Sequence, residues 1–101
     1  MRVRNVCSER TGTSVANQVI ITDEGRGSLG NFKKRETFQS YNSVIAIRTV
    51  WGDGTRVELD QEKWDYSVTT GKYRNAFLNE TKRETERKIK SGEYKLVNLN
   101  K

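Results

Sequence analysis

The chain has 101 residues, enough for one domain with a single modest core and too few for two. Hydrophobic residues make up 33% of it and charged residues 32%, so the core must be thin, while an aromatic content of 9% excludes the composition of a disordered chain. The net charge of +6 comes from two basic flanks, residues 1–35 and 67–101, around an acidic middle, residues 36–66. Basic flanks of this kind suit contact with phosphates.

The residue types exclude several kinds of catalytic and metal site. Because the chain has no histidine, it cannot form a Ser-His or Cys-His catalytic pair or a His-ligated metal site. Its one cysteine, Cys7, can form neither an internal disulfide nor a thiolate zinc cluster, and it indicates a reducing compartment. No segment resembles a secretion signal or a membrane span. We therefore expect a cytoplasmic protein that is not an enzyme, needs no cofactor or metal, and does not contact a membrane.

The first third of the chain predicts one short strand between two flexible segments. Residues 1–13 show no hydrophobic period and end in turn-forming residues, so we expect a flexible tail. Residues 15–22 contain three consecutive β-branched residues and predict a strand. The glycines and serine of residues 25–31 predict a flexible loop.

The middle of the chain predicts a group of paired strands. Residues 43–51 contain the strongest β-branched run and should form the central strand, after a strand in the second half of residues 32–41. An Asp-Gly pair in the turn Gly52–Gly54 predicts a hairpin. The return strand should be residues 55–60, where apolar and charged residues alternate.

The last third predicts two short helices. Apolar residues fall on one face of a helix that should run from about residue 71 to residue 78. The second helix should begin with a capping box formed by Thr81 and Glu84, and end at Gly92.

These elements predict an α+β fold in a single domain of residues 1–101. We expect a small antiparallel β-sheet of three to five strands, centred on residues 43–60, followed by the two short helices. The apolar residues within 94–99 should return as a C-terminal strand or an extended tail.

Two places in the chain combine basic and aromatic side chains, an arrangement in which rings can stack on bases while cations contact phosphates. The predicted contact residues for a nucleic acid or another partner are Lys33, Lys34, Arg35, Lys72, Tyr73 and Arg74. The alternative is that the Tyr73 ring belongs to the thin core and that the basic side chains form an ordinary solvated surface.

Trp51 and Trp64 each stand beside a predicted turn. Either is suited to anchor a protein partner, because aromatic residues are frequent in interface hot spots. Packing in the core is the alternative for both.

Two stretches of the chain carry a resemblance. Residues 37–46 read Thr-Phe-Gln-Ser-Tyr-Asn-Ser-Val-Ile-Ala, and residues 64–75 read Trp-Asp-Tyr-Ser-Val-Thr-Thr-Gly-Lys-Tyr-Arg-Asn. They resemble a family of small phage and prophage proteins of unknown function, and the similarity extends to Asn100. The resemblance implies an accessory protein made inside an infected bacterium and supplies no site residues.

We therefore expect a phage accessory protein that binds a nucleic acid or a nucleoprotein of the host, in host takeover or in an anti-defence role such as inhibition of a CRISPR-type effector. One alternative is an inhibitor that binds a host defence protein or metabolic enzyme through an exposed aromatic residue and a sheet edge, without touching nucleic acid. Another is a structural component of the virion. The sequence leaves the oligomeric state open.

Overall fold

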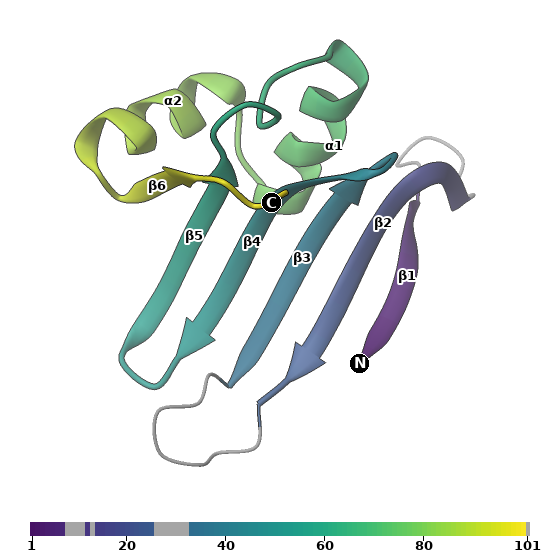
Figure 1. Ribbon diagram of the computed structural model, residues 1–101, viewed down its shortest axis with the longest axis horizontal. Coiled ribbons are helices and arrows are strands. Elements are labelled where there is room, and N and C mark those ends of the chain that lie inside the picture. The colour runs from purple at the N-terminus through teal and green to yellow at the C-terminus, as the bar shows by residue number, and fades with distance from the viewer. Residues whose placement is uncertain (8–11, 13, 26–32, 101) are drawn as a thin grey trace.

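The structure is a computed structural model, which describes residues 1–7, 12, 14–25 and 33–100. In chain order the elements are β1 (Arg2–Cys7), β2 (Ser14–Glu24), β3 (Lys34–Ser40), β4 (Ser43–Trp51), β5 (Gly54–Asp60), α1 (Val68–Leu78), α2 (Lys82–Ser91) and β6 (Tyr94–Val97). The strands form one sheet, and both helices gather at the end of it that holds the turn between β3 and β4 (Figure 1).

The sheet has six strands in the order β1-β2-β3-β4-β5-β6, so the prediction of a three- to five-stranded antiparallel sheet is wrong. The first five strands pair antiparallel, each with its neighbour in sequence. The last strand, β6, pairs parallel to β5, which makes the sheet mixed. A parallel pair needs a crossover connection, and α1 and α2 together supply it.

The N-terminal strand β1 accounts for the additional strand. Its residues were expected in a flexible tail, but they pair with β2 along a register that runs from Arg2 opposite Thr22 to Cys7 opposite Ser14. The guanidinium of Arg2 also lies 2.7 Å from a carboxylate oxygen of Glu24. The rest of the predicted tail, apart from residue 12, and residues 26–31 of the predicted loop lie outside the described residues.

The core lies between one face of the sheet and the helices. Its buried apolar residues are Val6, Ile20, Phe38, Ile45, Ala46, Val57, Leu59, Phe77, Leu78 and Tyr94. Phe38 of β3 stacks on Phe77 of α1 with ring centroids 5.7 Å apart. The guanidinium of Arg48 lies 4.5 Å from the Phe77 centroid and donates a hydrogen bond of 2.8 Å to the Phe77 carbonyl. This packing fixes α1 against β3 and β4.

The carboxylate of Asp60, at the end of β5, holds the C-terminal segment in place. One oxygen accepts the N–H of Leu99 at 2.8 Å, and the other accepts the N–H groups of Glu62 and Lys63 at 3.1 and 2.9 Å. Burial raises the pKa of Asp60, but the hydrogen bonds outweigh burial and leave this pKa below its usual value. The carboxylate of Asp60 therefore has a structural role.

No helix within the described ranges is long and apolar enough to cross a bilayer. Within the same ranges, no three acidic or cysteine side chains lie close enough together to form a metal site.

Candidate functional site

Helix α2 has ends that its own sequence specifies. The hydroxyl of Thr81 accepts the N–H of Glu84, the carboxylate of Glu84 accepts the N–H of Thr81, and both distances are 3.2 Å. Gly92 ends the helix in the left-handed conformation, at φ 84°. The predicted capping box and helix stop are therefore confirmed.

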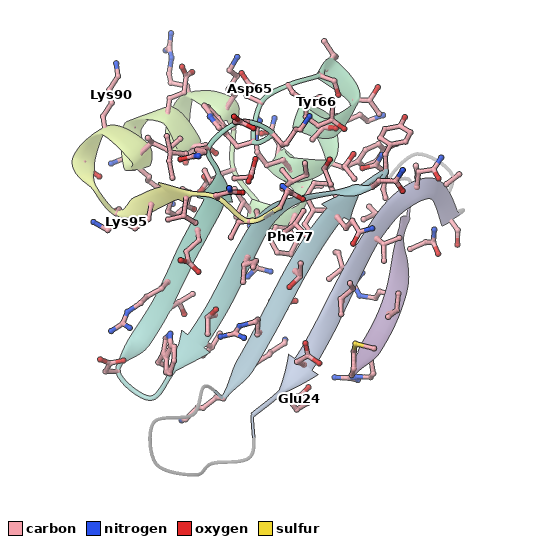
Figure 2. The ribbon with its side chains drawn as sticks, in the orientation of Figure 1. Glu24, Asp65, Tyr66, Phe77, Lys90 and Lys95 are labelled. Carbon is pink, nitrogen blue, oxygen red and sulfur yellow. The ribbon has the colours of Figure 1, made fainter. Side chains whose placement is uncertain are left out.

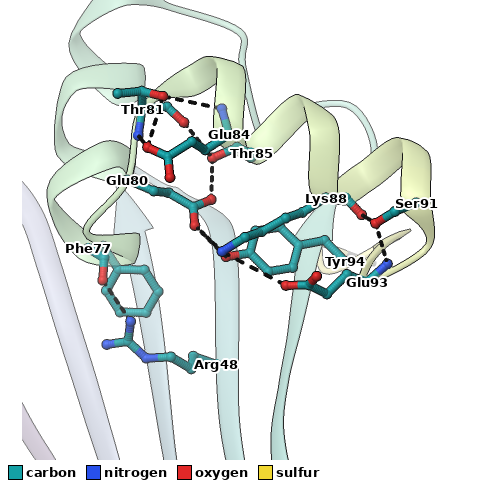
Figure 3. A network of polar contacts seen from close by, with 10 residues as sticks. All are labelled: Arg48, Phe77, Glu80, Thr81, Glu84, Thr85, Lys88, Ser91, Glu93 and Tyr94. Carbon is teal, nitrogen blue, oxygen red and sulfur yellow. Dashed lines mark hydrogen bonds and ion pairs between the residues drawn. The ribbon is translucent and has the colours of Figure 1, made fainter.

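A polar network holds the inner face of α2, where Ile89 is the only large apolar residue of the helix (Figure 3). At its centre is Glu80, whose side chain is 3% exposed. One carboxylate oxygen accepts hydrogen bonds from Lys88 and from the Tyr94 hydroxyl, both at 2.8 Å. The other accepts the Thr85 hydroxyl at 2.6 Å. The network therefore joins α2 to β6 and fixes the rotation of the helix.

The pKa values of the network favour a charged Glu80 and Lys88 beside a neutral Tyr94. Burial raises the pKa of Glu80, but the three hydrogen bonds outweigh it and lower this pKa. The hydrogen bond to Glu80 raises the pKa of Lys88. Burial, followed by the bond to Glu80, raises the pKa of Tyr94 to about 12.

The outer face of α2 presents three basic side chains, Arg83, Arg87 and Lys90, which we call the basic stripe. Their spacing of i, i+4 and i+7 places them on one side of the helix, and all three are exposed. Figure 2 shows Lys90 pointing away from the sheet. Within the part of the chain that the structure describes, none of the three forms a hydrogen bond or an ion pair. The basic stripe therefore keeps its charge available to a partner.

The other two basic residues of α2 have internal partners. Lys88 belongs to the Glu80 network, and Lys82 lies 2.7 Å from Asp65. The hydrogen bond to Asp65 raises the pKa of Lys82. Burial raises the pKa of Asp65, but the hydrogen bonds from Lys82 and Arg74 outweigh it and lower this pKa. Asp65 thereby joins the loop before α1 to the start of α2.

Arg74, one of the predicted contact residues, lies inside the molecule with 1% of its surface exposed. Its guanidinium donates to the Trp64 carbonyl at 2.6 Å, to Asp65 at 3.1 Å and to the side-chain oxygen of Asn75 at 3.0 Å. The same group lies 5.1 Å from the centroid of a Trp64 ring. Arg74 therefore has a structural role and is not available at the surface as a contact residue.

The first predicted basic group lies at the far end of the sheet from the helices, where β3 begins (Figure 1). Lys33 is exposed, and the ammonium of Lys34 lies 3.9 Å from Glu36. Arg35 points to the opposite face and donates to the hydroxyl of Thr49 at 3.4 Å. The three side chains therefore do not form one continuous surface.

The second predicted group is only partly exposed. Lys72 is exposed on α1 and lies 5.4 Å from the ring centroid of Tyr73, and that ring packs, half-buried, against the core. Both predicted tryptophan anchors, Trp51 and Trp64, are half-buried, and Trp64 packs against the core.

The basic stripe could have been predicted from the helical spacing of the sequence, but the contact residues were predicted from neighbouring basic and aromatic residues instead. Once the second helix is bounded by Thr81 and Gly92, the positions opposite its one apolar residue, Ile89, are those of the stripe. The burial of Arg74 had no comparable signal, because its carbonyl and carboxylate partners lie in an irregular segment.

No curated protein and no solved structure matches the chain. A family model does match, over residues 1–93, which include every element except β6. The match supplies no chemistry, because the family is described only as one of unknown function. On this match, the chain belongs to DUF8033, a family of unknown function.

Proposed function

We propose that this protein is not an enzyme and that it binds the phosphate backbone of a nucleic acid, free or within a nucleoprotein, through the basic stripe of α2. The observation that carries the proposal is the availability of Arg83, Arg87 and Lys90, which are exposed and have no internal partner in the described part of the chain. Cations of this kind gain affinity for nucleic acid by releasing the counterions condensed on its phosphates.

The dimensions of the basic stripe suit a nucleic-acid backbone. Lys90 follows Arg83 by seven positions, so the stripe is about 10.5 Å long at about 1.5 Å per helical residue. One strand of B-DNA advances about 3.4 Å per phosphate along its axis, so the stripe spans about three phosphate-to-phosphate steps, which join about four successive phosphates. Because the Glu80 network fixes the rotation of α2, the three side chains are held toward the same side before a partner arrives.

The biological setting of the proposal rests on the resemblance to phage and prophage proteins. In that setting the partner is a nucleic acid or nucleoprotein in the cytoplasm of the infected cell, and an anti-defence role, such as inhibition of a CRISPR-type effector, fits a small basic accessory protein. The phage origin stays a prediction, because membership of DUF8033 carries no such information.

A direct binding experiment tests the proposal. Fluorescence anisotropy would measure the affinity of the chain for labelled 20-nucleotide DNA and RNA, single-stranded and duplex. In the stripe variant, Arg83→Gln, Arg87→Gln and Lys90→Gln are combined. The matched control removes three positive charges at the other end of the sheet, by Lys33→Gln, Lys34→Gln and Arg56→Gln.

We expect the stripe variant to lose at least tenfold in affinity for every oligonucleotide, while the control variant stays within about threefold of the unaltered chain. Equal losses in the two variants would show that net charge alone is responsible. A loss confined to the control variant would move the interface to Lys33 and Lys34, as the sequence predicted. Either result would overturn the proposed role of the basic stripe.

An alternative function has one observation in its favour. Strand β1 is the first strand of the sheet order, so its outer edge has no strand beside it among the described residues, and Val3 is 58% exposed on it. An open edge can take a strand from another protein. A nuclease-resistant protein partner in a pull-down from bacterial lysate, lost when Val3 is replaced by proline, would support this alternative.

A further inference from the structure

A pocket of about 630 Å³ lies at the start of α1, on the side where α2 also begins. Its lining includes Tyr66 and Val68 at the start of α1, Lys72 and Asn75 one and two turns later, and Lys82 from α2. This volume is within the range of about 300–1,000 Å³ that is usual for ligand pockets. Resting on the proposed function, we infer that this pocket receives one unpaired nucleotide, so that the protein selects single-stranded nucleic acid.

The apolar part of the pocket is unusually exposed. Val68, the first residue of α1, is 91% exposed, and Tyr66 is 43% exposed. Neither residue belongs to the core, and helix initiation does not require a valine at this position because Ser67 supplies the cap. The ammonium of Lys63 lies 5.1 Å from the Tyr66 ring centroid and covers one face of this ring. We assign the other face to the base of the nucleotide, because aromatic rings stack on bases of any sequence.

The polar part of the pocket favours an anion. Lys72 has no carboxylate partner among the described residues. Asp65, a carboxylate that also lines the pocket, is paired with both Lys82 and Arg74, so the lining keeps an excess of positive charge. The first turn of α1 contains no acidic residue. These charges, together with the positive end of the helix dipole, suit the phosphate of a nucleotide.

A backbone N–H group and a side-chain NH₂ group are the further hydrogen-bond donors of the pocket. The hydroxyl of Ser67 accepts the N–H of Thr70 at 3.1 Å, and the N–H of Val68, which lines the pocket, has no acceptor within the described ranges. The side-chain oxygen of Asn75 is held by Arg74, which leaves its NH₂ group to donate to the edge of a base.

The pocket and the basic stripe are continuous along the chain. Lys82 lines the pocket, and the next residue, Arg83, begins the stripe. The step from Arg83 to Lys82 is one helical residue, about 100° around α2, and in the inferred complex the strand follows this step from the stripe to the pocket. Only an unpaired strand can turn a base face toward Tyr66, because the base faces of a duplex are stacked on their neighbours.

The test compares a labelled 12-nucleotide oligothymidylate with a duplex of the same length in anisotropy titrations. Tyr66→Leu removes the ring and keeps apolar bulk, while Tyr66→Phe keeps the ring and serves as the matched control. We expect the unaltered chain to prefer the single strand. Tyr66→Leu should weaken single-strand binding about 5- to 150-fold and leave duplex binding and the thermal midpoint unchanged, while Tyr66→Phe should bind like the unaltered chain.

The outcomes separate this inference from the proposed function. Equal affinity for the two oligonucleotides, or single-strand binding by Tyr66→Leu that equals the unaltered chain, would overturn the inference even where the stripe variant still shows a loss of affinity. A Tyr66→Leu effect with an unaffected stripe variant would support the pocket and overturn the role of the stripe. Absence of binding by the unaltered chain would overturn both.

Discussion

Replacement of Glu80 by alanine should destabilise the protein through the loss of one buried hydrogen-bonding centre. Hydrogen bonds to a charged acceptor contribute about 1.5–3 kcal/mol each, and those from Thr85 and Tyr94 are both largely shielded from water. The side chain of Lys88 is 23% exposed, so we count its ion pair at below about 1 kcal/mol. The free energy of unfolding should therefore fall by at least about 3 kcal/mol in Glu80→Ala, the lower end of the sum of these contributions.

Urea unfolding followed by tryptophan fluorescence measures this change. Glu86→Ala is the matched control, because Glu86 is exposed on the same helix and accepts no hydrogen bond, and its loss should cost less than about 0.5 kcal/mol. Glu80→Gln keeps an acceptor and loses the charge, so it should fall between the two and remain measurable if the alanine variant does not fold. A Glu80→Ala variant as stable as Glu86→Ala would refute the anchoring of α2 by this network.

Three further predictions concern single residues. Since folding raises the pKa of Tyr94 from 10.0 to about 12, its contribution to stability should be fully present below pH 10 and should be lost between pH 10 and 12. In a pH series of unfolding midpoints, Tyr94→Phe should show a smaller fall over this interval than the unaltered chain. Arg74→Met should cost about 3 kcal/mol in urea unfolding, because Asp65 and two oxygen acceptors lose their donor. Gly92→Ala should cost about 1 kcal/mol at φ 84°, whereas Gly52→Ala, with open space at its Cβ and no positive φ, should be close to neutral by thermal unfolding.

Local features of the fold were predictable because neighbouring residues determine them. The Asp-Gly turn does join two antiparallel strands, β4 and β5, and the capping box does begin α2. The first helix begins at Val68, before the predicted residue 71, because the hydroxyl of Ser67 caps it. Gly71 is then an interior helix position, where an added Cβ would lie 3.6 Å from the Arg74 guanidinium.

Long-range pairing was not predictable in the same way. Strand β1 is stabilised by its register with β2 and by the Arg2–Glu24 ion pair, both of which join residues far apart in sequence. The parallel position of β6 depends on how α1 and α2 pack, which periodicity alone does not determine. The candidate site divides in the same way, since the exposure of the basic stripe follows from helical spacing, while the burial of Arg74 follows from tertiary contacts.

The most direct test of the central claim is the salt dependence of duplex DNA binding. If the three cations of the basic stripe contact phosphates, the slope of log K against log salt concentration should be less steep by about 2.7 in the stripe variant than in the unaltered chain, at about 0.9 per phosphate contact. An unchanged slope would mean that Arg83, Arg87 and Lys90 do not contact the backbone, and it would contradict the proposed function.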